Sequence, residues 1–173
     1  SGIRQEVLVL AELQRRIKHL RYPYVWDCVP PNSCSIRKRP DMLWYYGQWY
    51  LHVEIDERGS QHENSYDRLL SIQRTLTATN NNGPPIKGLV LRINPNAKGG
   101  RSMLKKSWLP SCNKRIWYAK EPYFSQQMQT IETWLLNNVF NGKVTTCEPP
   151  KLSFDKNGLY VHRFFFENLS VSL

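Results

Sequence analysis

The chain has 173 residues, the usual size of one domain built around one hydrophobic core. Its 24 Lys and Arg against 14 Asp and Glu give a net charge of +10, which favours a polyanionic partner, with nucleic acid the leading candidate. No apolar run approaches the roughly 18 to 20 residues that span a bilayer, and no signal-peptide pattern opens the chain, so we expect a soluble, intracellular protein without a membrane partner.

The N-terminal residues 3–20 have the pattern of an amphipathic helix. Apolar residues recur there every three or four positions, with basic residues between them. Prolines interrupt residues 22–40, so regular structure in that range is limited to a short edge strand near 24–28.

Residues 39–57, RPDMLWYYGQWYLHVEIDE, predict two antiparallel strands joined by a two-residue turn at Gly47. Counting outward from the turn pairs Tyr46 with Trp49, Tyr45 with Tyr50, Trp44 with Leu51, Leu43 with His52, Met42 with Val53, and Asp41 with Glu54. Directly opposed carboxylates project from one face with Cβ atoms about 5 Å apart, and they repel each other. Because strand side chains alternate, Asp56 falls on the same face if the strand continues.

The chain then predicts helix, strand and helix in turn. Residues 63–79 carry a helical apolar stripe, and residues 87–95, KGLVLRINP, form the continuous apolar run of a buried strand. A strand-helix-strand order makes this strand parallel to the one that contains Glu54. Residues 124–140 have the periodicity of a further helix.

Two further segments complete the expected architecture. Residues 101–120 contain Lys, Arg, Trp and Tyr but no acid, and we interpret them as a basic aromatic loop or partly ordered arm. Residues 152–166 predict a β-hairpin about a turn at 155–158. We therefore expect a single α/β domain over 1–173, with a central mixed β-sheet flanked by helices, a core over about 3–140 and a C-terminal β-hairpin extension over 144–173.

The opposed carboxylates require compensating charge. Carboxylate oxygens are the ligands that Mg²⁺ or Mn²⁺ prefers, and a divalent ion would remove the repulsion between Asp41 and Glu54. In a basic protein, that ion would lie where a phosphodiester docks, and it could activate a water for attack. The alternative is that the acids only end the strands and pair with nearby surface cations.

The cysteines are expected to be reduced thiols, since the chain has no CxxC pair and is large enough to fold without disulfides. A disulfide between Cys28 and Cys34 stays open, as does a zinc site that combines cysteines with His19 or His162. The four cysteines are Cys28, Cys34, Cys112 and Cys147.

These motifs together resemble a known class of nuclease. The resemblance rests on RPDM, then HVEIDERGSQH, then a Tyr and an Arg on the following helix, and finally LVLRINPN, over roughly residues 39–96. The pattern is similar to the PD-(D/E)XK nuclease superfamily, and more closely to a restriction-endonuclease-like family of large DNA viruses and protists that is related to the very-short-patch repair type.

The resemblance implies a restriction-endonuclease-like core and a Mg²⁺- or Mn²⁺-dependent endonuclease, with DNA favoured over RNA. It makes Asp41 and Glu54 metal ligands, the Ile55 carbonyl a further ligand, and Asp56 an active-site acid. On the first helix, where superfamily members often contribute another metal-ligand acid, Glu12 is the candidate. The alternatives there are a solvated Glu12, or Glu6 in its place.

The chain departs from the superfamily signature at Asp56, where a Lys is expected two residues after the Glu. The resembled family tolerates Asp there, and the missing positive charge could come from Lys38, Lys87 or Arg92, or from a second metal. Arg92, at the end of its strand, is a catalytic candidate whose alternative is a salt bridge to Asp56 or Glu57. His62 is a candidate general base or phosphate contact, or else an exposed residue at a helix entry.

The basic surface supplies the expected contacts to nucleic acid. The candidate nucleic-acid-binding residues are Lys38, Arg39, Arg68, Arg74, Arg101, Lys105, Lys106, Trp108, Lys114 and Arg115. For the two helical arginines, a solvated helix face is the alternative. A catalytically inactive nucleic-acid-binding module and a protein-interaction domain of a larger assembly also stay open, as do a homodimer and a nuclear or viral-factory compartment.

Overall fold

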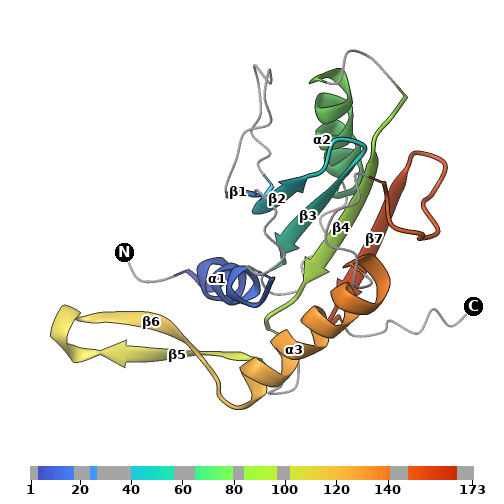
Figure 1. The fold of residues 1–173 in the computed structure, drawn as a ribbon. Helices are drawn as coiled ribbons and strands as arrows, with labels where there is room; N and C mark the ends of the chain where they lie inside the picture. Colours follow the sequence, from blue (N-terminus) through green and yellow to red (C-terminus); the bar gives the residue numbers. More distant parts are fainter. Residues whose placement is uncertain are drawn as a thin grey trace, which may run out of the picture.

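The computed structural model describes residues 4–17, 24–26, 40–56, 65–79, 84–96, 102–140 and 148–166. It is a mixed α/β structure in which three α-helices flank a mixed β-sheet (Figure 1). No helix in these ranges has the length and apolar character needed to cross a bilayer.

Within the described residues, the main sheet has five strands in the order β1-β2-β3-β4-β7. The strands are β1 (Tyr24–Trp26), β2 (Met42–Tyr45), β3 (Trp49–Ile55), β4 (Lys87–Ile93) and β7 (Leu159–Phe164). The pairs β1-β2 and β2-β3 are antiparallel, whereas β3-β4 and β4-β7 are parallel. The predicted edge strand and the predicted parallel pairing of β4 with β3 are both confirmed.

The β2-β3 hairpin has the register expected from its turn. Tyr45 lies opposite Tyr50 and Met42 lies opposite Val53. Gly47 has a φ of 89°, a left-handed conformation that glycine adopts without strain, and it allows the tight two-residue connection. With this register, Asp41, the residue before β2, lies beside the C-terminal end of β3.

Alternation along the strands divides the core into two layers (Figure 1). One layer packs the sheet against α1 (Gln5–Ile17) and α3 (Tyr123–Leu135), and the other packs it against α2 (Ser65–Thr79). The predicted periodicities hold, because the buried positions of α1 and α3 are spaced one turn apart. After α3, the chain continues in a π-helical turn over Leu136–Phe140.

The predicted C-terminal β-hairpin is wrong. The turn itself is present, since the Gly158 N–H donates to the Asp155 carbonyl at 2.9 Å, but residues 151–154 form no strand. The residues after the turn instead pair with β4, which offers a buried, apolar edge for parallel addition. The Asp155 side chain also accepts bonds from the N–H groups of Asn157 and Leu159, and so shapes the turn without a partner strand.

The basic aromatic segment is also more ordered than the expected loop or partly ordered arm. Strands β5 (Leu104–Leu109) and β6 (Lys114–Ala119) form a separate two-stranded antiparallel sheet that extends away from the main body (Figure 1). They are connected by a 3-10 turn over Pro110–Cys112, and Asn113 follows it with a φ of 53°. Asn tolerates this left-handed conformation, which makes the reversal. We call residues 104–119 the arm.

Candidate active site

The candidate site lies where β3 ends, on the face of the sheet that α2 covers. Asp41 precedes β2, and its Oδ2 atom accepts a hydrogen bond of 2.8 Å from the backbone N–H of Ile55. Glu54 is the preceding residue of β3 and is buried, with 7% of its surface exposed. The structure therefore brings together the two acids that the hairpin register predicts to be neighbours.

Two other side chains hold Glu54. His52, fully buried two residues earlier in β3, lies with Nε2 2.5 Å from Oε1 of Glu54. From α2, the Arg68 guanidinium forms an ion pair of 2.6 Å with the same oxygen. Burial alone would raise the pKa of Glu54, but His52 and Arg68 together lower it below its ordinary value. Glu54 is therefore a stable carboxylate near neutral pH.

Asp41 has no ion-pair partner comparable to those of Glu54 among the described residues. Within the described part of the chain, no basic side chain forms an ion pair with Asp41. Burial, followed by the negative charge of Glu54, raises the pKa of Asp41 to about 7, although the Ile55 N–H and the positive charge of Arg68 oppose the shift. Two acids held close together, one of them without an ion pair among the described residues, create a site that favours a cation.

Asp56 and Arg92 form a separate ion pair next to this site. The Asp56 Oδ2 atom lies 2.6 Å from Nε of Arg92, and both side chains are largely buried. Arg92 is the register partner of Glu54 on the parallel strand β4, so it reaches Asp56 from the neighbouring strand. This is the salt bridge that the sequence left open for Arg92, and it occupies the carboxylate of Asp56.

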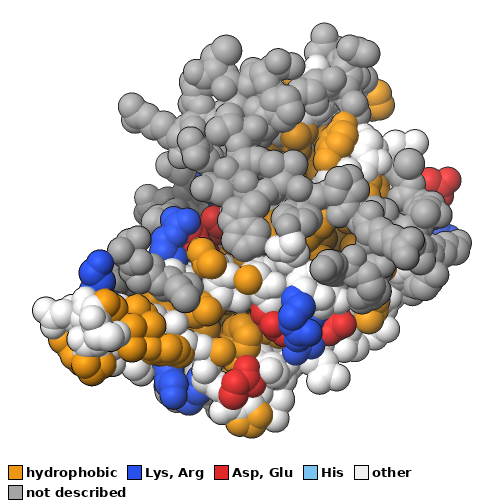
Figure 2. All heavy atoms as spheres, turned by 60° about the vertical axis from the view of Figure 1, so that its left-hand side comes forward, with side chains coloured by type: hydrophobic (Ala, Val, Ile, Leu, Met, Phe, Trp, Pro, Cys, Tyr) orange, Lys and Arg blue, Asp and Glu red, His pale blue; other side chains and the backbone are white. Residues whose placement is uncertain are grey.

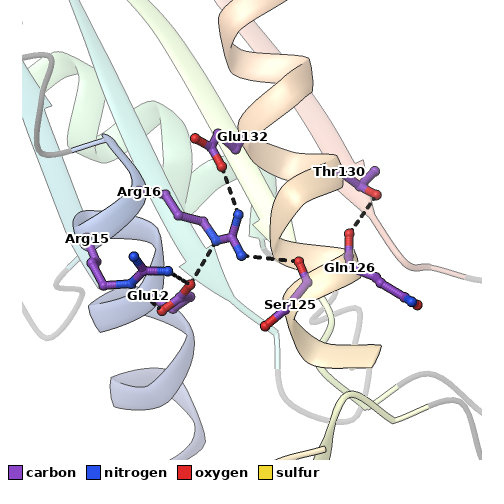
Figure 3. A network of polar contacts seen from close by, with 7 residues as sticks. All are labelled: Glu12, Arg15, Arg16, Ser125, Gln126, Thr130 and Glu132. Atoms are coloured by element: carbon purple, nitrogen blue, oxygen red, sulfur yellow. Dashed lines mark hydrogen bonds and ion pairs between the residues drawn. The ribbon is translucent and has the colours of Figure 1, made fainter. Parts of the chain in front are cut away.

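The first helix contributes an acid to this region at a different position from the candidate Glu12. Glu12 accepts hydrogen bonds from Arg15 and Arg16, and Arg16 also binds Glu132 at 2.8 Å, so the group bridges α1 and α3 (Figure 3). By contrast, the charge of Glu6 contributes to the raised pKa of Asp41. The alternative Glu6 thus lies closer to the acid pair.

The expected nucleic-acid-binding residues fall into three groups. Arg68 is bound to Glu54, and Arg74 is exposed on α2. The arm carries the remaining described ones, which are Lys105, Lys106, Trp108, Lys114 and Arg115. Lys38, Arg39 and Arg101 lie outside the described residues, and so does the catalytic candidate His62.

Within the described ranges, the structure shows neither the disulfide nor the zinc site that the sequence leaves open for the cysteines. Cys112 is an exposed free thiol in the turn of the arm, whereas the His162 ring stacks on Trp134 with the ring centroids 4.2 Å apart. The other cysteines and His19 lie outside the described residues.

The most informative residue that the sequence interpretation missed is His52. A signal for it exists, because strand alternation puts His52 on the same face as Glu54 two positions later. The pairing of Arg68 with Glu54 could not be obtained in this way, since it depends on how α2 is rotated over the sheet.

The donor set fits a magnesium-type ion but does not form a complete protein cage. Among the described residues, no three His, Cys, Asp or Glu side chains converge on one point. Mg²⁺ commonly binds through one or two carboxylates and completes its shell with waters and substrate phosphates. The Ile55 N–H binds Oδ2 of Asp41, and His52 and Arg68 contact Oε1 of Glu54, so the second oxygen of each carboxylate is the candidate ligand for such an ion.

The fold and the site together define an α/β protein in which a buried Glu54 and a partly buried Asp41 lie at the end of a mixed sheet. No model of a known protein family matches the chain, and no curated protein is significantly similar to it in sequence.

Proposed function

We propose that this chain is a Mg²⁺- or Mn²⁺-dependent endonuclease with a restriction-endonuclease-like core, which hydrolyses phosphodiester bonds in DNA rather than RNA. The observation that carries the proposal is the carboxylate pair of Asp41 and Glu54, in which Asp41 forms no ion pair with a described residue and has a raised pKa. The net charge of +10 supports a polyanionic substrate. The preference for DNA rests on the resemblance of the motifs.

Asp41 and Glu54 would hold the metal through their available oxygens. The N–H and C=O groups of a strand residue point to the same side, so the Ile55 carbonyl is directed to the same edge as the N–H that binds Asp41. It is therefore the natural third ligand. When bound, the ion would polarise the phosphoryl oxygen and lower the pKa of an attacking water.

Arg68 is our candidate for the positive charge that a motif Lys supplies in the superfamily. Asp56 occupies the Lys position here, and its carboxylate is paired with Arg92. Arg68 places its guanidinium 2.6 Å from Glu54 from the helix side instead. A guanidinium there can neutralise charge on a docked phosphate oxygen and leave the metal-facing oxygens of the acids available.

The experiment is cleavage of labelled single-stranded DNA, duplex DNA and RNA in Mn²⁺, Mg²⁺ or EDTA. We compare the wild type with Asp41→Asn and Glu54→Gln, which keep the size of each side chain. The matched control is Asp67→Asn, the same chemical change at an exposed position of α2. We expect metal-dependent cutting that both site variants lose and the control retains. Cutting that persists in EDTA or in Asp41→Asn contradicts the proposal.

A second candidate function is a nucleic-acid-binding module on the same fold without cleavage. The ion pair between Asp56 and Arg92 favours it, because this pair replaces the motif Lys with a neutralised acid. Such a module would bind oligonucleotides with a strong salt dependence in every metal. Asp41→Asn would then leave all measured affinities unchanged, and no substrate would be cut.

A further inference from the structure

The arm is fixed at its base to the end of the sheet that holds the acid pair. Met103 and Leu104 are buried in the core, and the Met103 N–H donates to the Pro95 carbonyl at 3.0 Å. Pro95 follows the C-terminal end of β4, which runs parallel to β3 with Arg92 beside Glu54. The arm therefore starts near the C-terminal ends of β3 and β4, the end of the sheet where the candidate active site lies (Figure 1).

Register and alternation give the arm two distinct faces. Directly opposed residues share a face, and one face carries the pairs Lys106 with Trp117 and Trp108 with Arg115. Each strand thus contributes one cation and one indole to this face. The opposite face carries Lys105 and Lys114 among its residues.

The two tryptophans of this face have different surroundings. Trp117 is partly buried against the core cluster, and Nζ of Lys106 lies 5.5 Å from its ring centroid. Trp108 is 54% exposed, more than any other large apolar side chain among the described residues. Trp117 therefore anchors the arm, whereas Trp108 offers an open aromatic ring beside Arg115.

The charge of the arm selects the kind of partner. Residues 102–120 contain Lys105, Lys106, Lys114, Arg115 and Lys120 and no acid. In Figure 2, apolar side chains gather over the arm at the lower left, with Lys and Arg at its margins. An apolar protein groove would leave these cations unpaired, but a nucleic acid strand supplies both phosphates and aromatic bases.

We propose that the arm binds an unpaired segment of nucleic acid, with a base stacked on Trp108 and the flanking phosphates held by Lys106 and Arg115. An unpaired segment fits better than a duplex, because duplex bases are already stacked on each other and present no free ring face. The inference rests on the proposed function for its biological meaning: the substrate of the endonuclease would carry a single-stranded part next to the cleaved bond. The binding itself can be tested without cleavage.

The test measures anisotropy of labelled dT20, rU20 and a 20-base-pair DNA duplex with the full chain in EDTA, where the proposed metal is absent. Trp108→Ala should weaken binding to the single strands by about fivefold or more, since stacking on an aromatic side chain is worth about 1–3 kcal/mol per base. Duplex affinity should change by less than about twofold, because its bases are not free to stack. Trp108→Phe should retain most single-strand affinity.

Charge variants provide the control. Lys106→Ala combined with Arg115→Ala should weaken single-strand binding, whereas Lys151→Ala combined with Lys156→Ala, two exposed cations outside the arm, should leave it nearly unchanged. An equal loss on single strands and duplex in Trp108→Ala, no loss at all, or no binding by the wild type would each overturn the proposal. Circular dichroism of Trp108→Ala verifies that the fold is kept.

The two proposals fail separately. If the wild type cuts nothing but Trp108→Ala loses single-strand affinity, the arm proposal stands and the endonuclease proposal fails. If metal-dependent cutting is lost in Asp41→Asn while Trp108→Ala binds single strands like the wild type, the endonuclease stands and the arm proposal fails.

Discussion

Asp41→Asn should stabilise the metal-free protein at alkaline pH while it removes the proposed activity. Burial and the charge of Glu54 raise the pKa of Asp41 from its ordinary 3.8 to about 7. The carboxylate form is therefore unfavourable in the folded state. Asn resembles the protonated acid in charge and size, and its carbonyl oxygen can still accept the Ile55 N–H.

The size of the effect follows from the difference in proton affinity. One pKa unit corresponds to about 1.4 kcal/mol, so the ionised Asp41 should lower the free energy of unfolding by at most about 4 kcal/mol. Below pH 3.8 the acid is protonated in both states and contributes nothing. Between 3.8 and about 7 the folded state binds more protons, so wild-type stability falls as the pH rises, and above about 7 the loss is complete.

The assay is urea or thermal unfolding in EDTA from pH 4 to 8.5. Asp41→Asn should exceed the wild type in stability at pH 8, and the difference should vanish near pH 4. At about 2–4 °C per kcal/mol for a domain of this size, the gain is measurable as a melting shift. Mg²⁺ at pH 8 should stabilise the wild type and leave Asp41→Asn unaffected. A destabilised variant at pH 8, or a difference independent of pH, would refute the reasoning.

Three further substitutions test the packing. Gly88→Ala should destabilise the fold by about 1–3 kcal/mol, because its Cβ would clash with the buried ring and hydroxyl of Tyr50; urea unfolding measures the loss. Tyr50→Phe should be neutral or stabilising by the same measurement, since that buried hydroxyl has no hydrogen-bond partner among the described residues; a clear loss of stability would contradict this. Arg16→Ala should lower the melting temperature by removing the α1–α3 bridge, whereas Arg15→Ala, at a side chain 68% exposed, should leave it nearly unchanged.

The hairpin shows how far local sequence rules determine the fold. Gly47 identifies the turn, alternation identifies the faces, and together they give the pairing of Met42 with Val53 and the proximity of Asp41 to Glu54. All of these inferences use residues within one continuous segment. Helix positions are equally predictable from apolar spacing, because each amphipathic stripe has to face the sheet.

Prediction from the sequence fails where a strand pairs with a strand that is distant in the sequence. The turn at Asp155 is visible in the sequence, yet nothing local indicates that the strand after it pairs with β4 rather than with the residues before it. For residues 101–120 the sequence predicts a basic aromatic loop or partly ordered arm, because basic and aromatic residues are interleaved there. The reversal at Asn113 and the anchoring of Trp117 against the core supply the order that this pattern does not reveal.

The pattern of charge compensation implies an order of binding. Arg68 neutralises Glu54, and Arg92 neutralises Asp56, so Asp41 contributes the remaining negative charge of the group once it is ionised. A phosphodiester approaching this group alone would meet repulsion from Asp41, whereas a divalent cation would meet attraction. On the proposed function, the metal therefore has to bind before the scissile phosphate can bind in the site. The arm can engage its part of the substrate independently, because its cations lie outside the acid pair.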